Sequence, residues 1–182
     1  KADEMRQALA AGIHAFNVES SGELERLDSV AAEMGVRAPF ALRVNPDVQS
    51  RTPHEYTATG HAATKFGVPF REAADLYRWA ALRPHLHARG IDVHIGSQII
   101  ETEPYLRALD RVLSLARELN GEGLHLEFLD MGGGFGIPYE EGPELDVHAL
   151  ADKVVPRVRA AGLRLMLEPG RSIVGDAGVL LT

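Results

Sequence analysis

Apolar residues recur along this chain at two spacings that alternate from one end to the other. In residues 103–120 they fall every three or four positions, for example at Leu106, Leu109, Val112 and Leu113, which places them on one face of a helix. Short, nearly continuous apolar runs lie between such segments and are typical of buried strands. Helices are therefore expected at 2–11, 21–34, 69–82, 103–120 and 146–161, and strands at 13–18, 38–44, 90–95, 126–131 and 163–167.

Strands that alternate with helices form a parallel sheet, which is either open and doubly wound or closed into an eight-stranded barrel. Both folds place their chemistry at the carboxyl ends of the strands, but an open sheet concentrates it at one switch point. Here polar groups follow four successive strands, at Arg43 with Asn45, at His94 with Ser97 and Gln98, at 130–136 and at 168–171. This spread favours a barrel rim. We predict an α/β fold, a partial (β/α)8 TIM barrel with about five βα units.

The two ends of the sequence indicate a piece of a longer protein. The chain opens with Lys1 and passes at once into a predicted helix, while residues 178–182 form an apolar, strand-like run with no turn after it. We expect further chain on both sides. Residues 45–64 are rich in Pro, Thr, His and Gly without a sustained period, which predicts a long loop.

Composition narrows the classes of function. The 182 residues carry 26 acidic and 19 basic side chains, a net charge of -7, so a cationic surface for nucleic acid or anionic lipid is not expected. No apolar run approaches the ~20 residues of a membrane-spanning helix. The absence of cysteine excludes disulfides, thiolate nucleophiles and thiolate metal sites within this sequence, and it fits a cytoplasmic protein.

Two loops after neighbouring strands carry candidate chemistry. The backbone amides of Gly132, Gly133 and Gly134 can surround an anion such as phosphate, although a tight turn explains the same glycines. In the second loop, Glu168 can bind a protonated ring nitrogen, and Arg171 can hold phosphate or carboxylate oxygens. A mutual salt bridge between Glu168 and Arg171 is the alternative.

The histidines give weaker signals. His94 can offer a flat face to an aromatic ring, and Ser97 beside it can donate to an anion, but a packed core histidine is the alternative. His85 and His87 alternate as zinc ligands do in some sites. No third ligand is evident near them, and we expect no metal site.

Six segments resemble the motifs of one known family. They are, in order, FNVES at 16–20, LRVNPD at 42–47, KFG at 65–67, HIGSQ at 94–98, the segment 130–139 and EPGR at 168–171. Together they are similar to the alanine-racemase-type barrel of the fold-type III PLP-dependent ornithine, diaminopimelate and arginine decarboxylases, over essentially the whole sequence. The resemblance implies a PLP-binding barrel domain over residues 1–175. It also implies a crossover to a C-terminal β domain from residue 176, and a homodimer with shared active sites.

The resemblance also implies a role for each site residue. His94 would stack on the ring of pyridoxal 5′-phosphate (PLP), while Ser97 and the glycine loop 132–134 would hold its phosphate. Glu168 would pair with the pyridinium nitrogen, and Arg171 would bridge the phosphate and a substrate carboxylate. The expected set is catalytic His94 and Glu168, cofactor-binding His94, Ser97, Gly132, Gly133, Gly134, Glu168, Gly170 and Arg171, and substrate-binding Arg171, with no metal.

The lysines depart from the pattern that the family requires. Such an enzyme attaches its cofactor covalently to a lysine, and this sequence holds only Lys1, Lys65 and Lys153, none of which suits that role. Lys65 resembles a position near the subunit interface, and Arg43 is expected to brace the site from below. The resemblance places the attachment lysine on an earlier strand, so the 182 residues alone are expected to be inactive.

The substrate is the least determined part of the resemblance. Gln98 and the segment 136–139 look more like the diaminopimelate branch than the eukaryotic ornithine branch, which implies decarboxylation of meso-diaminopimelate to L-lysine and CO₂. Ornithine, arginine or a carrier-bound amino acid as substrate, and a PLP-binding homologue without activity, stay open. A phosphosugar-binding barrel enzyme is a further alternative, but the carboxylate of Glu168 beside a phosphate pocket argues against it.

Overall fold

The centre of the molecule is a sheet of parallel strands. A computed structural model of the chain describes residues 1–48, 66–139 and 142–178. In this part the sheet order is β1-β2-β4-β5-β6, with β3 paired to β2. The strands are β1 (Phe16–Val18), β2 (Ala38–Asn45), β3 (Val68–Pro69), β4 (Leu86–Asp92), β5 (Phe128–Asp130) and β6 (Arg164–Met166). The helices are α1 (Ala2–Ala10), α2 (Ser21–Met34), α3 (Phe70–Ala81), α4 (Glu103–Gly121), α5 (Val147–Ala160), α6 (Arg171–Val174) and the 3-10 turn η2 (Gly175–Ala177).

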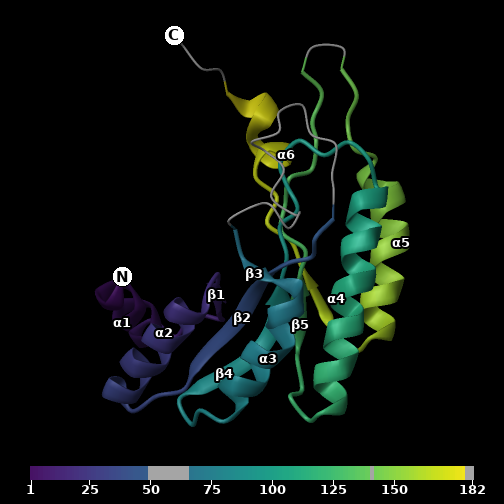
Figure 1. Cartoon of the computed structure of the whole chain (residues 1–182). Coiled ribbons are helices and arrows are strands. Elements are labelled where there is room, and N and C mark those ends of the chain that lie inside the picture. Colours follow the sequence, from purple (N-terminus) through teal and green to yellow (C-terminus); the bar gives the residue numbers. More distant parts are fainter. Residues whose placement is uncertain (49–65, 140–141, 179–182) are drawn as a thin grey trace.

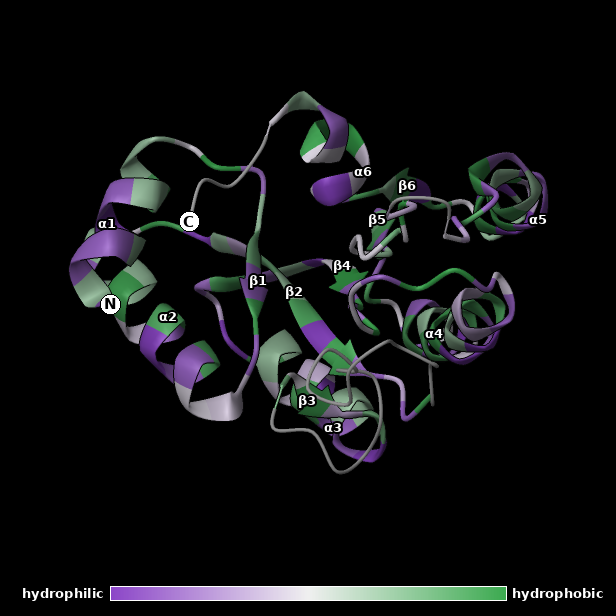
Figure 2. Ribbon diagram, turned by 90° about the horizontal axis from the view of Figure 1, so that it is seen from above, coloured by the Kyte–Doolittle hydropathy of each residue, from purple (hydrophilic) through white to green (hydrophobic). Residues whose placement is uncertain are grey.

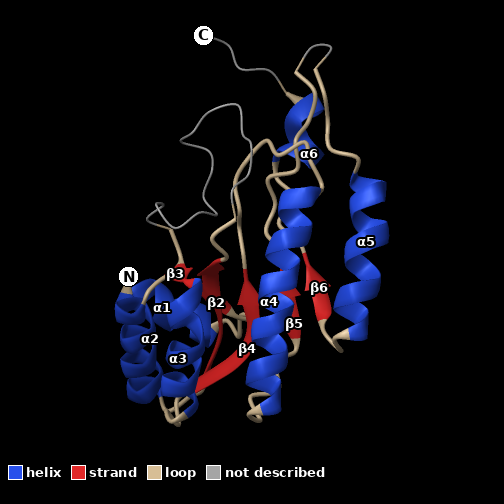
Figure 3. Ribbon diagram, turned by 45° about the vertical axis from the view of Figure 1, so that its right-hand side comes forward, coloured by secondary structure: helices blue, strands red, loops and turns tan. Residues whose placement is uncertain are grey.

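The helices are arranged as in one side of a barrel. Figure 1 and Figure 3 show α2, α3, α4 and α5 on one face of the sheet, while α6 lies above the carboxyl end of β6. Seen from above, the strands follow a curve with the helices outside it (Figure 2). A doubly wound sheet carries helices on both faces, so the prediction of a partial βα barrel is confirmed.

Local signals set the helix ends where the sequence predicts them. The Ser20 hydroxyl accepts a hydrogen bond from the amide of Glu23 at 3.2 Å, which caps α2, and Gly35 ends that helix with a left-handed φ of 65°. Asp146 caps α5 in the same way, accepting from the amide of Ala149 at 2.9 Å. These helices bury their apolar faces against the sheet, so the core lies between the two layers.

The strand expected at 90–95 is wrong in its bounds, because β4 runs over Leu86–Asp92. Gly90 reads as a strand start in the sequence, but it lies within the strand. A Cβ on Gly90 would overlap the ring of Phe128 on the next strand, so glycine is required by packing. Arg89, which looks too polar for a buried strand, donates from Nε to Glu127 at 3.0 Å. His94 therefore follows the strand instead of lying on it.

Several predictions fall partly or wholly outside the described residues. The expected loop 45–64 begins with Asn45 as the last residue of β2, and residues 49–64 lie outside the description, as does Lys65. Residues 179–182 of the expected last strand also lie outside it. Within the described ranges, no helix has the length and apolar character needed to cross a bilayer. The domain boundary at residue 175 stays a prediction.

Candidate functional site

Polar side chains project from the uncovered face of the sheet, at its carboxyl edge. Arg43 on β2 is in register with Asp92 on β4, and Asp92 is in register with Asp130 on β5. Their neighbours Ile91 and Leu129 pack into the core between sheet and helices. Because side chains alternate along a strand, the two aspartates and the arginine point away from the helices, toward the barrel interior.

The loops after β4, β5 and β6 are joined by backbone hydrogen bonds. The amide of Ile99 donates to the carbonyl of Gly134 at 2.9 Å, and the amide of Glu168 donates to the carbonyl of Gly132 at 2.8 Å. A Cβ on Gly133 would overlap the carbonyl oxygen of Glu168, and one on Gly134 would overlap that of Gly96. The glycine loop is thus more than a tight turn, because its missing side chains let three loops meet.

The imidazole of His94 stands against this glycine loop. Its Nδ1 accepts from the amide of Gly133 at 3.4 Å. Burial lowers the pKa of His94, and the charge of Arg43 lowers it further, so the ring is neutral near pH 7. The half-buried imidazole is thereby oriented by the loop and is more than a core filler.

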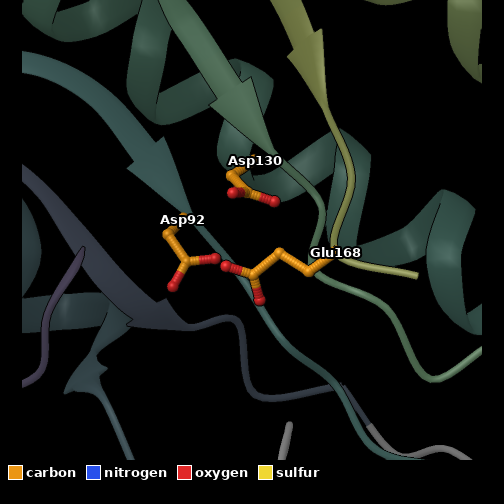
Figure 4. A group of neighbouring side chains, drawn as sticks. All are labelled: Asp92, Asp130 and Glu168. Atoms are coloured by element: carbon orange, nitrogen blue, oxygen red, sulfur yellow. The ribbon is translucent and has the colours of Figure 1, made fainter. Parts of the chain in front are cut away.

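The carboxylate of Glu168 reaches two aspartates. One carboxylate oxygen from each of Glu168, Asp92 and Asp130 lies within 4.8 Å of the other two (Figure 4). Burial, with the repulsion of Asp130 and Glu168, raises the pKa of Asp92 to about 8. Burial also raises the pKa of Asp130. Such a cluster attracts a cationic group of a ligand.

Arg171 is held by Gln98. Nη1 of Arg171 donates to Oε1 of Gln98 at 3.2 Å, and its guanidinium lies 5.9 Å from the ring centre of Tyr139. Among the ion pairs of the described residues, Arg171 is not paired with Glu168, so the alternative of a mutual salt bridge is wrong. The side-chain amide of Gln98 also donates from Nε2 to the carbonyl of Ile137 and accepts at Oε1 from the amide of the same residue.

The remaining predicted residues lie around the same rim. Ser97 follows Gly96, and its Cα lies 3.4 Å from the position that a Gly134 Cβ would take. Gly170 is the N-cap residue of α6. Lys153 is exposed on the outer helix α5, away from the rim. Arg43 forms an ion pair with Glu19, in which Nη1 and Oε1 are 2.7 Å apart.

Sequence reasoning missed two residues of this site. Asp92 lies in none of the six segments, although it is the last residue of β4, as Asp130 is of β5. Asn17 on β1 donates from Nδ2 to Oε1 of Glu168 at 3.3 Å. The available signal was the strand parity: Asp92 lies two positions before His94 and therefore on the same side of the chain.

Comparison with known proteins places the chain in a family. A family model described as pyridoxal-dependent decarboxylase, pyridoxal binding domain, matches residues 1–175. The chain belongs to this family. A curated member, diaminopimelate decarboxylase of Pseudomonas aeruginosa, is 50% identical over 99% of the chain and 43% of its own length. The chain thus spans less than half the length of the curated relatives it matches.

Solved structures of the family share the fold. Diaminopimelate decarboxylase from Helicobacter pylori, complexed with L-lysine, superposes with a TM-score of 0.91 at 35% identity, covering 95% of this chain and 44% of that one. Lysine decarboxylase from Selenomonas ruminantium gives a TM-score of 0.74 at 29% identity, covering 92% and 41%. Membership of the pyridoxal-dependent decarboxylases, expected from the six segments, is confirmed.

Proposed function

We propose that this chain is part of a PLP-dependent decarboxylase that converts meso-diaminopimelate to L-lysine and CO₂ in the cytoplasm, as a homodimer. The family and the 50% identity to a diaminopimelate decarboxylase support the reaction. The observation that carries the proposal is the meeting of His94, the glycine loop 132–134 and Glu168 at one rim. A single flat molecule can touch all of these groups.

The charges and the backbone of the described residues suit pyridoxal phosphate. Three carboxyl groups face the interior, and Asp92 has an oxygen without a partner in the described part of the chain, so a cationic ring suits this end. At the other end, the Gly134 amide has no acceptor among the described residues. The absent Cβ of Gly134 keeps the backbone open to an anion there.

Each residue then has a physical task. His94, neutral and oriented through Nδ1, offers its flat face to the ring. Glu168 would keep the ring nitrogen protonated by accepting a charge-assisted hydrogen bond from its N–H. Ser97, Gly170 and the Gly134 amide would supply donors to the phosphate oxygens, whereas the amides of Gly132 and Gly133 already donate to Asp130 and His94.

The chemistry that pyridoxal phosphate supplies is an acceptor for the electron pair left when CO₂ departs. Arg171, exposed at the rim and oriented by Gln98, binds phosphate or the substrate carboxylate. The lysine that attaches the cofactor is proposed to lie outside these 182 residues, so they are inactive on their own.

The test is CO₂ release by the full-length protein with meso-diaminopimelate, ornithine and arginine as separate substrates. We expect turnover of meso-diaminopimelate and a loss of about 10²-fold or more in kcat for Glu168→Gln, which removes the negative charge beside the ring. Glu118→Gln, an exposed carboxylate paired with Arg78 on the outer helices, is the control and is expected to keep full activity. Activity on ornithine alone would contradict meso-diaminopimelate as the substrate. An unchanged kcat in Glu168→Gln would contradict the proposed role of Glu168.

A further inference from the structure

Three carboxyl groups from neighbouring strands meet beneath the barrel rim. Oxygen atoms of Asp92, Asp130 and Glu168 all lie within 4.8 Å of one another, and Figure 4 shows the side chains converging from β4, β5 and the end of β6. Asp92 and Asp130 are each 3% exposed. Glu168 is exposed, so water screens its charge, but the two aspartates are buried and repel each other strongly at this separation, so they do not both stay ionised.

The donors around the cluster identify the group that keeps its proton. Oδ1 of Asp130 accepts from the amide of Gly132 at 2.9 Å, and Oε1 of Glu168 accepts from Nδ2 of Asn17 at 3.3 Å. Oδ1 of Asp92 is buried and has no hydrogen-bond partner within the described residues. A donor stabilises an ionised carboxylate, whereas a buried carboxyl without a donor favours its neutral form.

The charged groups around Asp92 have opposite effects on its ionisation. Asp130, Glu168 and Glu19 disfavour its ionisation, and Arg43 on the adjacent strand favours it. Arg43 is paired with Glu19 at 2.7 Å, so part of its charge is already neutralised. Burial is the largest influence, and the sum raises the pKa of Asp92 to about 8.

We propose that Asp92 is a positioning residue that stands protonated and donates a hydrogen bond to the carboxylate of Glu168. Figure 4 shows the carboxyl group of Asp92 facing that of Glu168. A neutral donor fixes the direction of the Glu168 carboxylate without adding a further negative charge beside it. The inference rests on the proposed function for the group that Glu168 then meets, a cationic ring nitrogen.

The protonation is tested on the full-length protein without cofactor, by infrared difference spectroscopy between wild type and Asp92→Asn. Asparagine has the same shape, donates through Nδ2 and cannot ionise. Wild type is expected to show, near neutral pH, a carboxylic-acid carbonyl band that Asp92→Asn lacks and that fades as the pH passes the Asp92 pKa of about 8. Asp92→Leu supplies the same subtraction if the asparagine variant does not fold. Absence of the band below neutral pH would overturn the proposal.

The positioning is tested by the affinity of the same protein for pyridoxal phosphate. Asp92→Ala removes the donor and is expected to weaken binding by roughly tenfold, whereas Asp92→Asn stays within about threefold of wild type. Asp28→Asn on α2 is the matched control, because Asp28 also has a buried Oδ1 without a partner among the described residues but lies outside the site. Equal affinities of the alanine and asparagine variants would overturn the positioning.

These measurements separate this inference from the proposed function. The infrared band belongs to the cofactor-free protein and is independent of the reaction. A missing band with intact decarboxylation overturns the role of Asp92 alone. A band together with no decarboxylation of any tested amino acid overturns the proposed function and leaves the protonated Asp92 supported.

Discussion

Replacing Gly134 with alanine separates two reasons why a loop residue has to be glycine. Gly134 has a left-handed φ of 81°, and its Cβ would also overlap the carbonyl oxygen of Gly96. Gly133 has the overlap, with the carbonyl of Glu168, but no positive φ. Gly162, after α5, has a φ of 73° and nothing within 4 Å of its Cβ position. Alanine at these three positions therefore separates the cost of the left-handed backbone, at Gly162, from the cost of the overlap, at Gly133, and from both together, at Gly134.

The expected losses of folding free energy follow from these geometries. A left-handed non-glycine residue costs about 1–2 kcal/mol, which is the whole effect at Gly162. Overlap with neighbouring backbone costs about 1–3 kcal/mol, which is the effect at Gly133. Gly134→Ala combines both, so we expect about 2–5 kcal/mol, together with a loss of pyridoxal phosphate binding because the loops after β4 and β5 move apart.

The assay is urea unfolding of the full-length variants, with cofactor absorbance recorded on each folded protein. Gly162→Ala is expected to bind the cofactor as wild type does. The reasoning is refuted if Gly134→Ala loses no more free energy of unfolding than Gly162→Ala and still binds the cofactor. In that case the close contact with Gly96 does not determine the shape of the loop.

Two further predictions concern the contacts that hold the rim. The Tyr77 hydroxyl accepts from the amide of Leu42 at 3.0 Å and donates to the carbonyl of Gly90 at 2.6 Å, so Tyr77→Phe removes a hydrogen-bond partner from each of two buried backbone groups. We expect a loss of about 2–4 kcal/mol in urea unfolding, and a loss below about 0.5 kcal/mol would contradict this account. Gln98→Ala removes the acceptor that orients Arg171 and is expected to raise the dissociation constant for pyridoxal phosphate by roughly three- to tenfold. Gln7→Ala on the exposed helix α1 is the control, and equal dissociation constants for the two variants would show that Gln98 does not orient the arginine.

Features encoded by neighbours in the sequence were predictable. Ser20 and Asp146 cap helices through residues three positions away, and Gly35 ends α2 by its own backbone conformation. The start of β4 was not predictable, because the reason for Gly90 is the ring of Phe128 on another strand. Such a contact is invisible until the strands are in register.

The same division applies to the site. His94, the glycine loop 132–134 and Glu168 stand out because they follow predicted strands within recognisable motifs. Asp92 does not, since it lies inside an expected strand and in none of the motifs, and only its spacing of two residues from His94 indicates the face that it occupies. The hydrogen-bond partner of Arg171 could not be predicted either, because Gln98 lies on a different loop and comes close to it only in the folded chain.

The contact between Phe128 and Gly90 has a consequence for the shape of the barrel interior. Phe128 is 1% exposed and is not part of the core between sheet and helices, and the ring centre of His14 lies 5.2 Å from its own, with the two rings tilted by 41°. Because side chains alternate along a strand, the Phe128 ring lies on the same face as Asp130, one side-chain layer below it, where a Cβ on Gly90 would otherwise be. This layer of the barrel interior therefore pairs the smallest residue with a large aromatic one on neighbouring strands, and a substitution at either position changes the packing beneath the carboxylates.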